Sequence, residues 1–251
     1  MVTSTDYLDD ETGINSSYVY DANGNVTEQT DARGHTSYSY YDSRNLLTHQ
    51  VDAENYLTTF AYDADGNVVE QLRYATALTS LDPNTAPTPI IDNTKDQISL
   101  FSYDEAGQLV RSLDAEGYLT TTGYDALGNV DETTRYYEQV GNINVNVTTI
   151  TNDNDATTTY DFDDQGRLTR VTDPRATSIY EEFKYDALGQ QVEFRNKAGG
   201  ITRYSYDSRG LMTESRVALA TYDGTGSLIG AQNVTQYEYD IRGLQLSLIH
   251  I

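Results

Sequence analysis

The chain has 251 residues, of which only 37% are hydrophobic, and it carries a formal net charge of −23 and no cysteine. So acidic a surface repels the phosphate backbone of nucleic acids. The lack of cysteine excludes disulfides, and no apolar run approaches the roughly 20 residues of a membrane-spanning helix. Its aromatic residues are 22 Tyr, 5 Phe and no Trp, which suits a thinly covered sheet because tyrosine can bury its ring and keep its hydroxyl in water.

An aromatic-Asp pair, followed by glycine, recurs along the chain and sets the fold. The spacings between successive pairs are 21, 21, 41, 21, 38, 23, 21 and 33 residues. A fixed internal period of this kind is the signature of a repeat architecture. The nine anchors are Tyr20-Asp21, Tyr41-Asp42, Tyr62-Asp63, Tyr103-Asp104, Tyr124-Asp125, Phe162-Asp163, Tyr185-Asp186, Tyr206-Asp207 and Tyr239-Asp240.

Each anchor predicts a tight hairpin turn. With the aromatic residue as position 0, position +4 holds a residue type that tolerates positive φ. An Asp that bonds the backbone two residues on, followed by a left-handed residue, is typical of a type I turn with a G1 bulge. The residues at +4 are Gly24, Asn45, Gly66, Gly107, Gly128, Gly166, Gly189, Gly210 and Gly243.

This turn predicts that the ring at position 0 pairs with position +6. An aliphatic side chain opposite an aromatic ring is a favourable cross-strand pair. Seven repeats have one at +6, namely Val26, Leu47, Val68, Leu109, Val130, Leu168 and Met212, whereas Gln191 and Gln245 are exceptions. Position −2 is mostly aromatic as well, so one face of the sheet is expected to carry an aromatic–aliphatic stripe.

A second turn follows at +11 to +14, as in Asp31–Gly34. The usual spacing of 21 is odd, so two identical turns would send successive anchor rings to opposite faces. The sequence therefore predicts that the second turn differs in type, with an even-numbered loop, or that each repeat carries one additional bulge. The spacing of 38 residues after Tyr124 is even, so the repeat that begins there is expected to lack this one-residue offset or to contain two.

We expect a single array of repeats over residues 1–251, with long hairpins or loops inserted at about 74–98, 136–159 and 218–235. The register predicts that a repeat is cut at each end. Asp10–Gly13 matches the second turn of a repeat whose anchor would precede Met1, and the last repeat stops before its second turn. The tail 246–251 is expected to be either non-native sequence or a frayed strand. The residues 1–13 are polar and acidic, so we do not expect them to be a signal peptide.

These motifs resemble the RHS/YD-repeat family, as in Tyr20-Asp-Ala-Asn-Gly-Asn-Val26, Tyr124-Asp-Ala-Leu-Gly-Asn-Val130 and Leu168-Thr-Arg-Val-Thr-Asp-Pro174. The resemblance covers nearly the whole chain outside the long insertions. It implies an all-β fold of tandem antiparallel hairpins in a continuous, curved sheet that spirals into a hollow shell. The family's shell-closing core and self-cleavage site lie C-terminal to the repeats, and neither has a match here.

The resemblance implies two alternative functions. One is a non-catalytic wall segment of a shell that encapsulates a C-terminal toxin domain absent from this sequence. The other is a cell-surface adhesion or carbohydrate-binding array. The implied partners are further repeats, a shell-closing core of the same protein and an encapsulated toxin, and the implied localisation is secreted, injected or at the cell surface.

No catalytic, cofactor or metal residues are predicted. His35, His49 and His250 are scattered, and the acidic residues recur with the turns and so single out no catalytic pair. The segment Asp63–Asn67 resembles the start of an EF-hand loop but has its glycine at the fourth position rather than the sixth. Asn152–Asp155 is interpreted as a solvated loop tip rather than a cation site, and the tyrosine stripe as cross-strand packing rather than a sugar platform.

Overall fold

The computed structural model describes residues 2–4, 16–140, 153–218 and 232–250. Its strands are β1 (Val2–Ser4), β2 (Ser17–Tyr20), β3 (Val26–Thr30), β4 (Thr36–Tyr41), β5 (Leu47–Val51), β6 (Leu57–Tyr62), β7 (Val68–Arg73), β8 (Gln97–Tyr103), β9 (Leu109–Leu113), β10 (Tyr118–Tyr124), β11 (Val130–Gln139), β12 (Ala156–Phe162), β13 (Leu168–Thr172), β14 (Tyr180–Tyr185), β15 (Gln191–Arg195), β16 (Ile201–Tyr206), β17 (Met212–Ala218), β18 (Gln232–Tyr239) and β19 (Gln245–His250). Within these ranges there is no helix, and so none long and apolar enough to cross a membrane.

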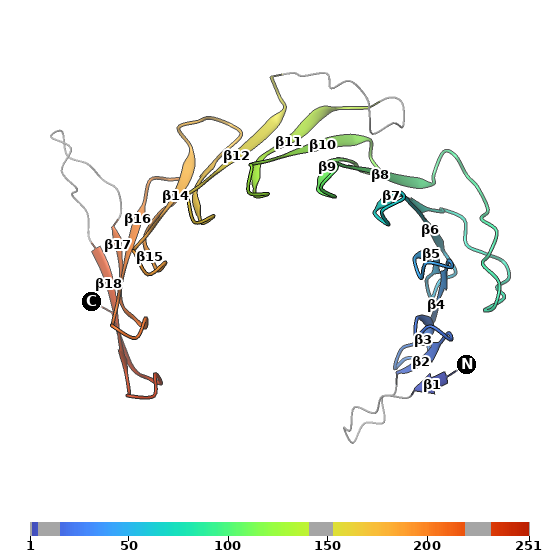
Figure 1. Cartoon of the computed structure of the whole chain (residues 1–251), viewed down its shortest axis with the longest axis horizontal. Helices are drawn as coiled ribbons and strands as arrows, with labels where there is room; N and C mark the ends of the chain where they lie inside the picture. Colours follow the sequence, from blue (N-terminus) through green and yellow to red (C-terminus); the bar gives the residue numbers. More distant parts are fainter. Residues whose placement is uncertain (1, 5–15, 141–152, 219–231, 251) are drawn as a thin grey trace. The chain divides into compact units, whose positions relative to one another are not determined.

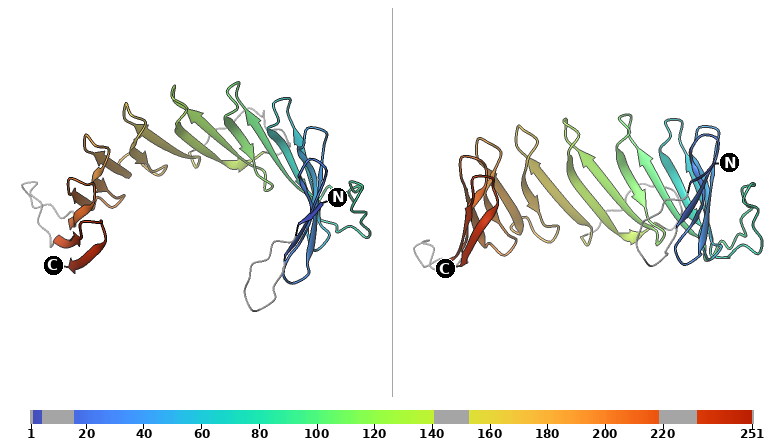
Figure 2. Two further views of the ribbon diagram at one scale, coloured as in Figure 1. Left: turned by 60° about the horizontal axis from the view of Figure 1, so that its bottom comes forward. Right: turned by 90° about the horizontal axis from the view of Figure 1, so that it is seen from below.

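The chain forms two compact lobes. The first comprises Met1–Thr121 with Glu138–Ile150, and the second comprises Thr122–Tyr137 with Thr151–Ile251. In the first lobe each strand from β1 to β9 pairs antiparallel with the next, and β9 pairs with the start of β10. In the second lobe β11 to β19 follow one another in the same way (Figures 1 and 2). The predicted all-β array of antiparallel hairpins is therefore confirmed within each lobe.

The first turn has the predicted register. Tyr20 lies opposite Val26, and the same 0-to-+6 pairing recurs at Tyr41, Tyr62, Tyr103, Phe162, Tyr185, Tyr206 and Tyr239. The next pair back is Val19 with Glu28, which leaves Thr27 without a partner as a β-bulge. All eight of these pairings carry a register shift at the same place, at position +7.

The expectation that the second turn differs in type was wrong, and the alternative of an additional bulge was right. The Asp31 N–H donates to the His35 carbonyl, and the Gly34 N–H donates to the Asp31 carbonyl, as in the first turn. The bulge at Thr27 supplies the one-residue offset, so the register places Tyr20 and Tyr41 on the same face. The expectation for the 38-residue spacing falls partly on residues 141–152, outside the described residues.

One second turn departs from the pattern. The Asp173 N–H reaches the carbonyl of Ile179, so this loop is two residues longer than the others, in keeping with the spacing of 23 after Phe162. Ala176 stands three residues after Asp173, where the second turns at Asp31, Asp52 and Asp114 have Gly or Asn, yet it is not among the residues with positive φ. The longer loop removes the need for a left-handed residue there.

The first long insertion packs on the sheet face opposite the anchor tyrosines. The Tyr74 N–H donates to the Leu57 carbonyl, and the Leu78 N–H donates to the Asn55 carbonyl, at 2.9 Å each. Both side chains join Tyr40, Val51 and Leu57 in the buried hydrophobic cluster of the first lobe. This segment was expected to be a hairpin or a loop, and the structure has a loop there. A single sheet cannot bury its own apolar face, and the loop covers that face in the first lobe.

The other two insertions begin as strand extensions. β11 pairs with β12 as far as Arg135 opposite Ala156, and β17 pairs with β18 as far as Ala218 opposite Gln232. Their tips, at 141–152 and 219–231, lie outside the described residues, as does the predicted turn at Asp10–Gly13. The tail strand β19 pairs with β18 through His250 opposite Thr235.

Candidate functional site: the repeated turn

Each anchor aspartate closes its own turn. In all nine repeats one carboxylate oxygen accepts the backbone N–H groups of positions +3 and +5, at 2.8–3.0 Å. The residues are Asp21, Asp42, Asp63, Asp104, Asp125, Asp163, Asp186, Asp207 and Asp240. A carboxylate that caps two N–H groups fixes the turn without help from the rest of the protein.

These bonds lower the pKa of several anchor aspartates, because they favour the charged form. For Asp21, Asp63 and Asp125 the largest cause is the side chain of the asparagine at +5, which donates to the second carboxylate oxygen. For Asp42, Asp163, Asp207 and Asp240 the largest cause is the backbone N–H at +5. The carboxylates are thus ionised and engaged in the turn.

The glycine column has the predicted conformation. The eight glycines at +4 have φ between 74° and 92°, and Asn45 has φ 62°. At Gly24 and Gly166 a Cβ would meet nothing within 4 Å, so backbone conformation rather than lack of space explains glycine there. Asn55 also has positive φ, 65°, at the equivalent position of a second turn.

Five anchor tyrosines join their own repeat to the preceding one. The Tyr41 hydroxyl donates to the carbonyl of Val26 at 3.1 Å, and the Tyr62 hydroxyl donates to that of Leu47 at 2.7 Å. The same bond, from position 0 to position +6 of the preceding repeat, is made by Tyr103, Tyr185 and Tyr206. The acceptor sits beside the bulge, where the regular ladder is interrupted, so the hydroxyl satisfies a carbonyl that the irregular strand pairing exposes.

The bulge has its own side-chain bond, which the sequence analysis missed. Thr27, Thr48 and Thr169 occupy position +7 and donate their hydroxyls to the carbonyl at position −1, at 3.0–3.2 Å. The signal was present in the sequence, because position +7 is Thr or Val in seven of the nine repeats. Such a column of β-branched residues beside a turn fits a bulged strand.

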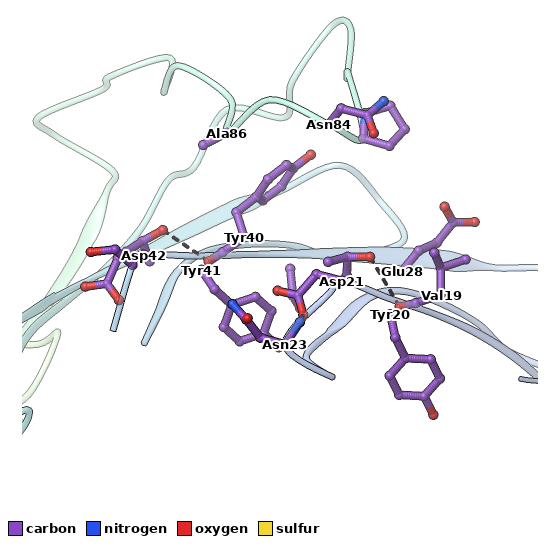
Figure 3. A pocket seen from close by; sticks show the side chains of 15 residues that line it. Val19, Tyr20, Asp21, Asn23, Glu28, Tyr40, Tyr41, Asp42, Asn84 and Ala86 are labelled. Carbon is purple, nitrogen blue, oxygen red and sulfur yellow. Dashed lines mark hydrogen bonds between the residues drawn. The ribbon is translucent and has the colours of Figure 1, made fainter. Parts of the chain in front are cut away.

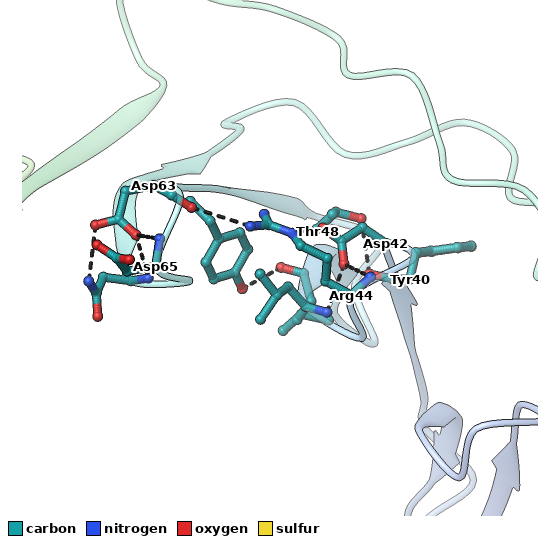
Figure 4. A network of polar contacts seen from close by, with 10 residues as sticks. Tyr40, Asp42, Arg44, Thr48, Asp63 and Asp65 are labelled. Atoms are coloured by element: carbon teal, nitrogen blue, oxygen red, sulfur yellow. Dashed lines mark hydrogen bonds and ion pairs between the residues drawn. The ribbon is translucent and has the colours of Figure 1, made fainter.

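Neighbouring turns also contact one another. The Arg44 guanidinium bonds the Asp42 carboxylate in its own turn and the Asp63 carbonyl in the next, at 3.3 Å each (Figure 4). Arg167 and Arg209 do the same in the second lobe, toward Asp186 and Asp240. Hydrogen bonds therefore join pairs of neighbouring turns in both lobes.

This arrangement gathers no catalytic constellation among the described residues. The His35 ring lies 3.3 Å from the Asp31 carboxylate within one exposed turn, and burial lowers the pKa of His49, whose ring contacts Tyr40 edge-on. No group of three or more His, Asp or Glu side chains in the described part of the chain is placed to hold a metal ion. The start of the candidate cation loop, Asn152, and the His250 side chain lie outside the description.

Comparison with known proteins places this architecture in a family. The RHS Repeat model matches residues 17–40, 41–79 and 103–139, and the Teneurin YD-shell model matches residues 129–250. The chain belongs to the RHS/YD-repeat family. No curated protein sequence matches this RHS/YD-repeat chain.

Solved structures share the fold of the RHS/YD-repeat chain at low identity. They include TcdB2-TccC3 without its hypervariable C-terminal region (16% identity, TM-score 0.53) and TcdB2-TccC3-Cdc42 (16%, 0.52). A third is the Tc holotoxin pore of Photorhabdus luminescens with a mutated TccC3 (17%, 0.52). In each, the match covers 94% of this chain and 12% of the other, so the chain spans about an eighth of the length of its structural relatives.

Proposed function

We propose that this chain is a non-catalytic section of the wall of a β-sheet shell, within a longer protein that encloses a toxin domain. In this proposal the turn and packing residues described above hold the strands of the wall together. The remaining wall, a closing core and the cargo would come from the same full-length protein, acting outside the producing cell after secretion or injection.

The hydroxyl bond from an anchor tyrosine to the preceding repeat carries this proposal. It recurs at five anchors with distances of 2.7–3.1 Å, across both lobes. A bond between repeats, rather than within one, is what a continuous wall requires and what a catalytic site does not. The lowered pKa values of seven anchor aspartates reflect turn closure, and the repetition of these carboxylates singles out none as an acid or base.

The match to the Teneurin YD-shell model over residues 129–250 supports a second candidate, a cell-surface adhesion array. The two candidates differ in what the full-length protein carries beyond the repeats. A toxin domain inside a closed shell belongs to the first, and a membrane or wall anchor with an exposed binding surface belongs to the second.

Electron microscopy of the full-length protein tests the shell, and limited proteolysis tests the enclosure. We expect a closed particle whose C-terminal segment resists protease, and deletion of the complete repeat 185–205 is expected to open the wall and expose that segment. Deletion of a loop tip such as 84–86 is the control and should leave protection intact. An open array with a freely digested C-terminal segment would refute the shell.

A further inference from the structure

A roofed groove lies on the face of the first lobe that the anchor rings leave free. It has a volume of about 580 Å³ and lies between strands β2–β4 and the first insertion. Figure 3 shows Tyr40, Val19 and Glu28 on the side of the insertion, and the rings of Tyr20 and Tyr41 on the other. The roof is formed by Pro83, Asn84 and Ala86.

The roof is held in place by polar contacts. The Tyr40 hydroxyl donates to the Asp82 carbonyl at 3.0 Å, and the Asp82 carboxylate accepts the Asn84 N–H at 2.9 Å. Tyr40 is nearly buried, with 9% exposure, and stands at position −1, where the other repeats have no aromatic residue. The groove is therefore preformed, which lowers the ordering cost of binding.

The groove combines apolar walls with uncompensated negative charge. Val19, Pro83 and Ala86 supply apolar surface, and no Lys or Arg lines the groove. The Glu28 carboxylate makes no hydrogen bond or ion pair with the described part of the chain. An opposite charge brought beside it would gain attraction without first breaking an internal pair.

The second lobe contains the same hollow with different chemistry. It has a volume of about 470 Å³ and is lined at the equivalent positions +8 and −1 by Arg170 and Lys184. Lys184 pairs with Glu193 at 2.8 Å, and the Arg170 guanidinium stacks 3.8 Å from the Tyr180 ring. Cations thus already occupy the hollow of the second lobe, whereas the hollow of the first lobe lacks them.

We propose that the groove of the first lobe binds an extended segment of a partner protein that presents a lysine or arginine beside an apolar side chain. The cation would pair with Glu28 while the apolar side chain packs between Val19 and Pro83. A second copy of the chain is a poor occupant, because two chains of charge −23 repel each other. This binding does not depend on the enclosure of a toxin.

Fluorescence anisotropy with a fluorescein-labelled peptide, Gly-Lys-Leu-Lys-Gly, tests the groove on the whole chain. We expect saturable binding that Glu28→Gln weakens about fivefold, the size of a partly exposed ion pair. Glu70→Gln is the matched control, because Glu70 occupies the same repeat position in the same lobe, outside the groove, and its substitution removes the same charge. It should bind as the native chain does.

Peptides with Glu in place of Lys, or Ser in place of Leu, should bind at least several-fold more weakly. Equal weakening by Glu28→Gln and Glu70→Gln would overturn the proposal, since it would report only attraction to an acidic protein. Absence of saturable binding, or equal binding of the Glu-containing peptide, would also overturn it. A benzophenone on the basic peptide should cross-link to residues 83–86, and exclusive attachment elsewhere would refute the location.

Discussion

Substitution of Gly166 isolates the conformational demand of the turn from packing. Its φ is +74°, and a Cβ there would meet nothing within 4 Å. A left-handed L-residue costs roughly 1–2 kcal/mol, which the loss of unfolded-chain entropy offsets by about 0.4–1 kcal/mol. We therefore expect Gly166→Ala to reduce the free energy of unfolding by about 1 kcal/mol and Gly166→Val by about 2 kcal/mol, because a β-branched residue is strained further.

Gly166→Asn should cost less than half as much as Gly166→Val, because Asn45 adopts this conformation naturally at the same repeat position. Thermal melts followed by circular dichroism measure the series, with a shift of about 2–4 °C expected per kcal/mol for a chain of this size. Gln165→Ala is the control, since Gln165 is exposed and donates only its backbone N–H to Asp163. Equal losses for Asn and Val, or a harmless Val, would refute the reasoning.

Three further predictions concern the same repeat. Gly128→Val should destabilise the chain more than Leu127→Ala, because Gly128 has φ +86° whereas Leu127 is 72% exposed; equal melting temperatures would contradict this. Tyr206→Phe should cost about 1 kcal/mol, because it removes the 2.7 Å bond to the Gln191 carbonyl, and an unchanged urea midpoint would argue against the tyrosine bond as a stabilising contact. The pKa of Asp207 in the folded chain is lowered from its ordinary value of 3.8. The stability that this carboxylate contributes is therefore fully present above pH 3.8 and is lost as pH falls through the folded pKa. Asp207→Asn should therefore be less stable than the native chain at pH 7, with a gap that narrows below about pH 4, and a gap independent of pH in urea titrations would count against the cap.

Local sequence was sufficient to predict the first turn. Asp21, Gly24 and the pairing of Tyr20 with Val26 depend on bonds within seven consecutive residues. Such a turn is closed by its own side chain and by one left-handed residue, so it does not depend on distant parts of the fold.

The offset between repeats was predicted as a requirement but not located. An odd spacing demands a correction, and the sequence left open whether it lay in the second turn or in a strand. The structure has it at Thr27 and its equivalents, with the Thr27 hydroxyl bonded across the hairpin to the Val19 carbonyl. A bulge is a property of two paired strands, so one strand read alone does not reveal which residue is left unpaired.

Sequence by itself thus determined the repeat, its first turn and the face that the anchor rings share, because these follow from contacts a few residues apart and from side-chain alternation. Only the tertiary structure decided where the chain buries its core. The insertion after Arg73 folds back over the face that the anchor rings leave free, and it places Tyr74 and Leu78 against Val51 and Leu57. That contact joins an irregular loop to strand residues up to 27 positions earlier, from Leu78 back to Val51, and the apolar residues of the loop follow no helical or strand period. The roofed groove arises from the same long-range packing.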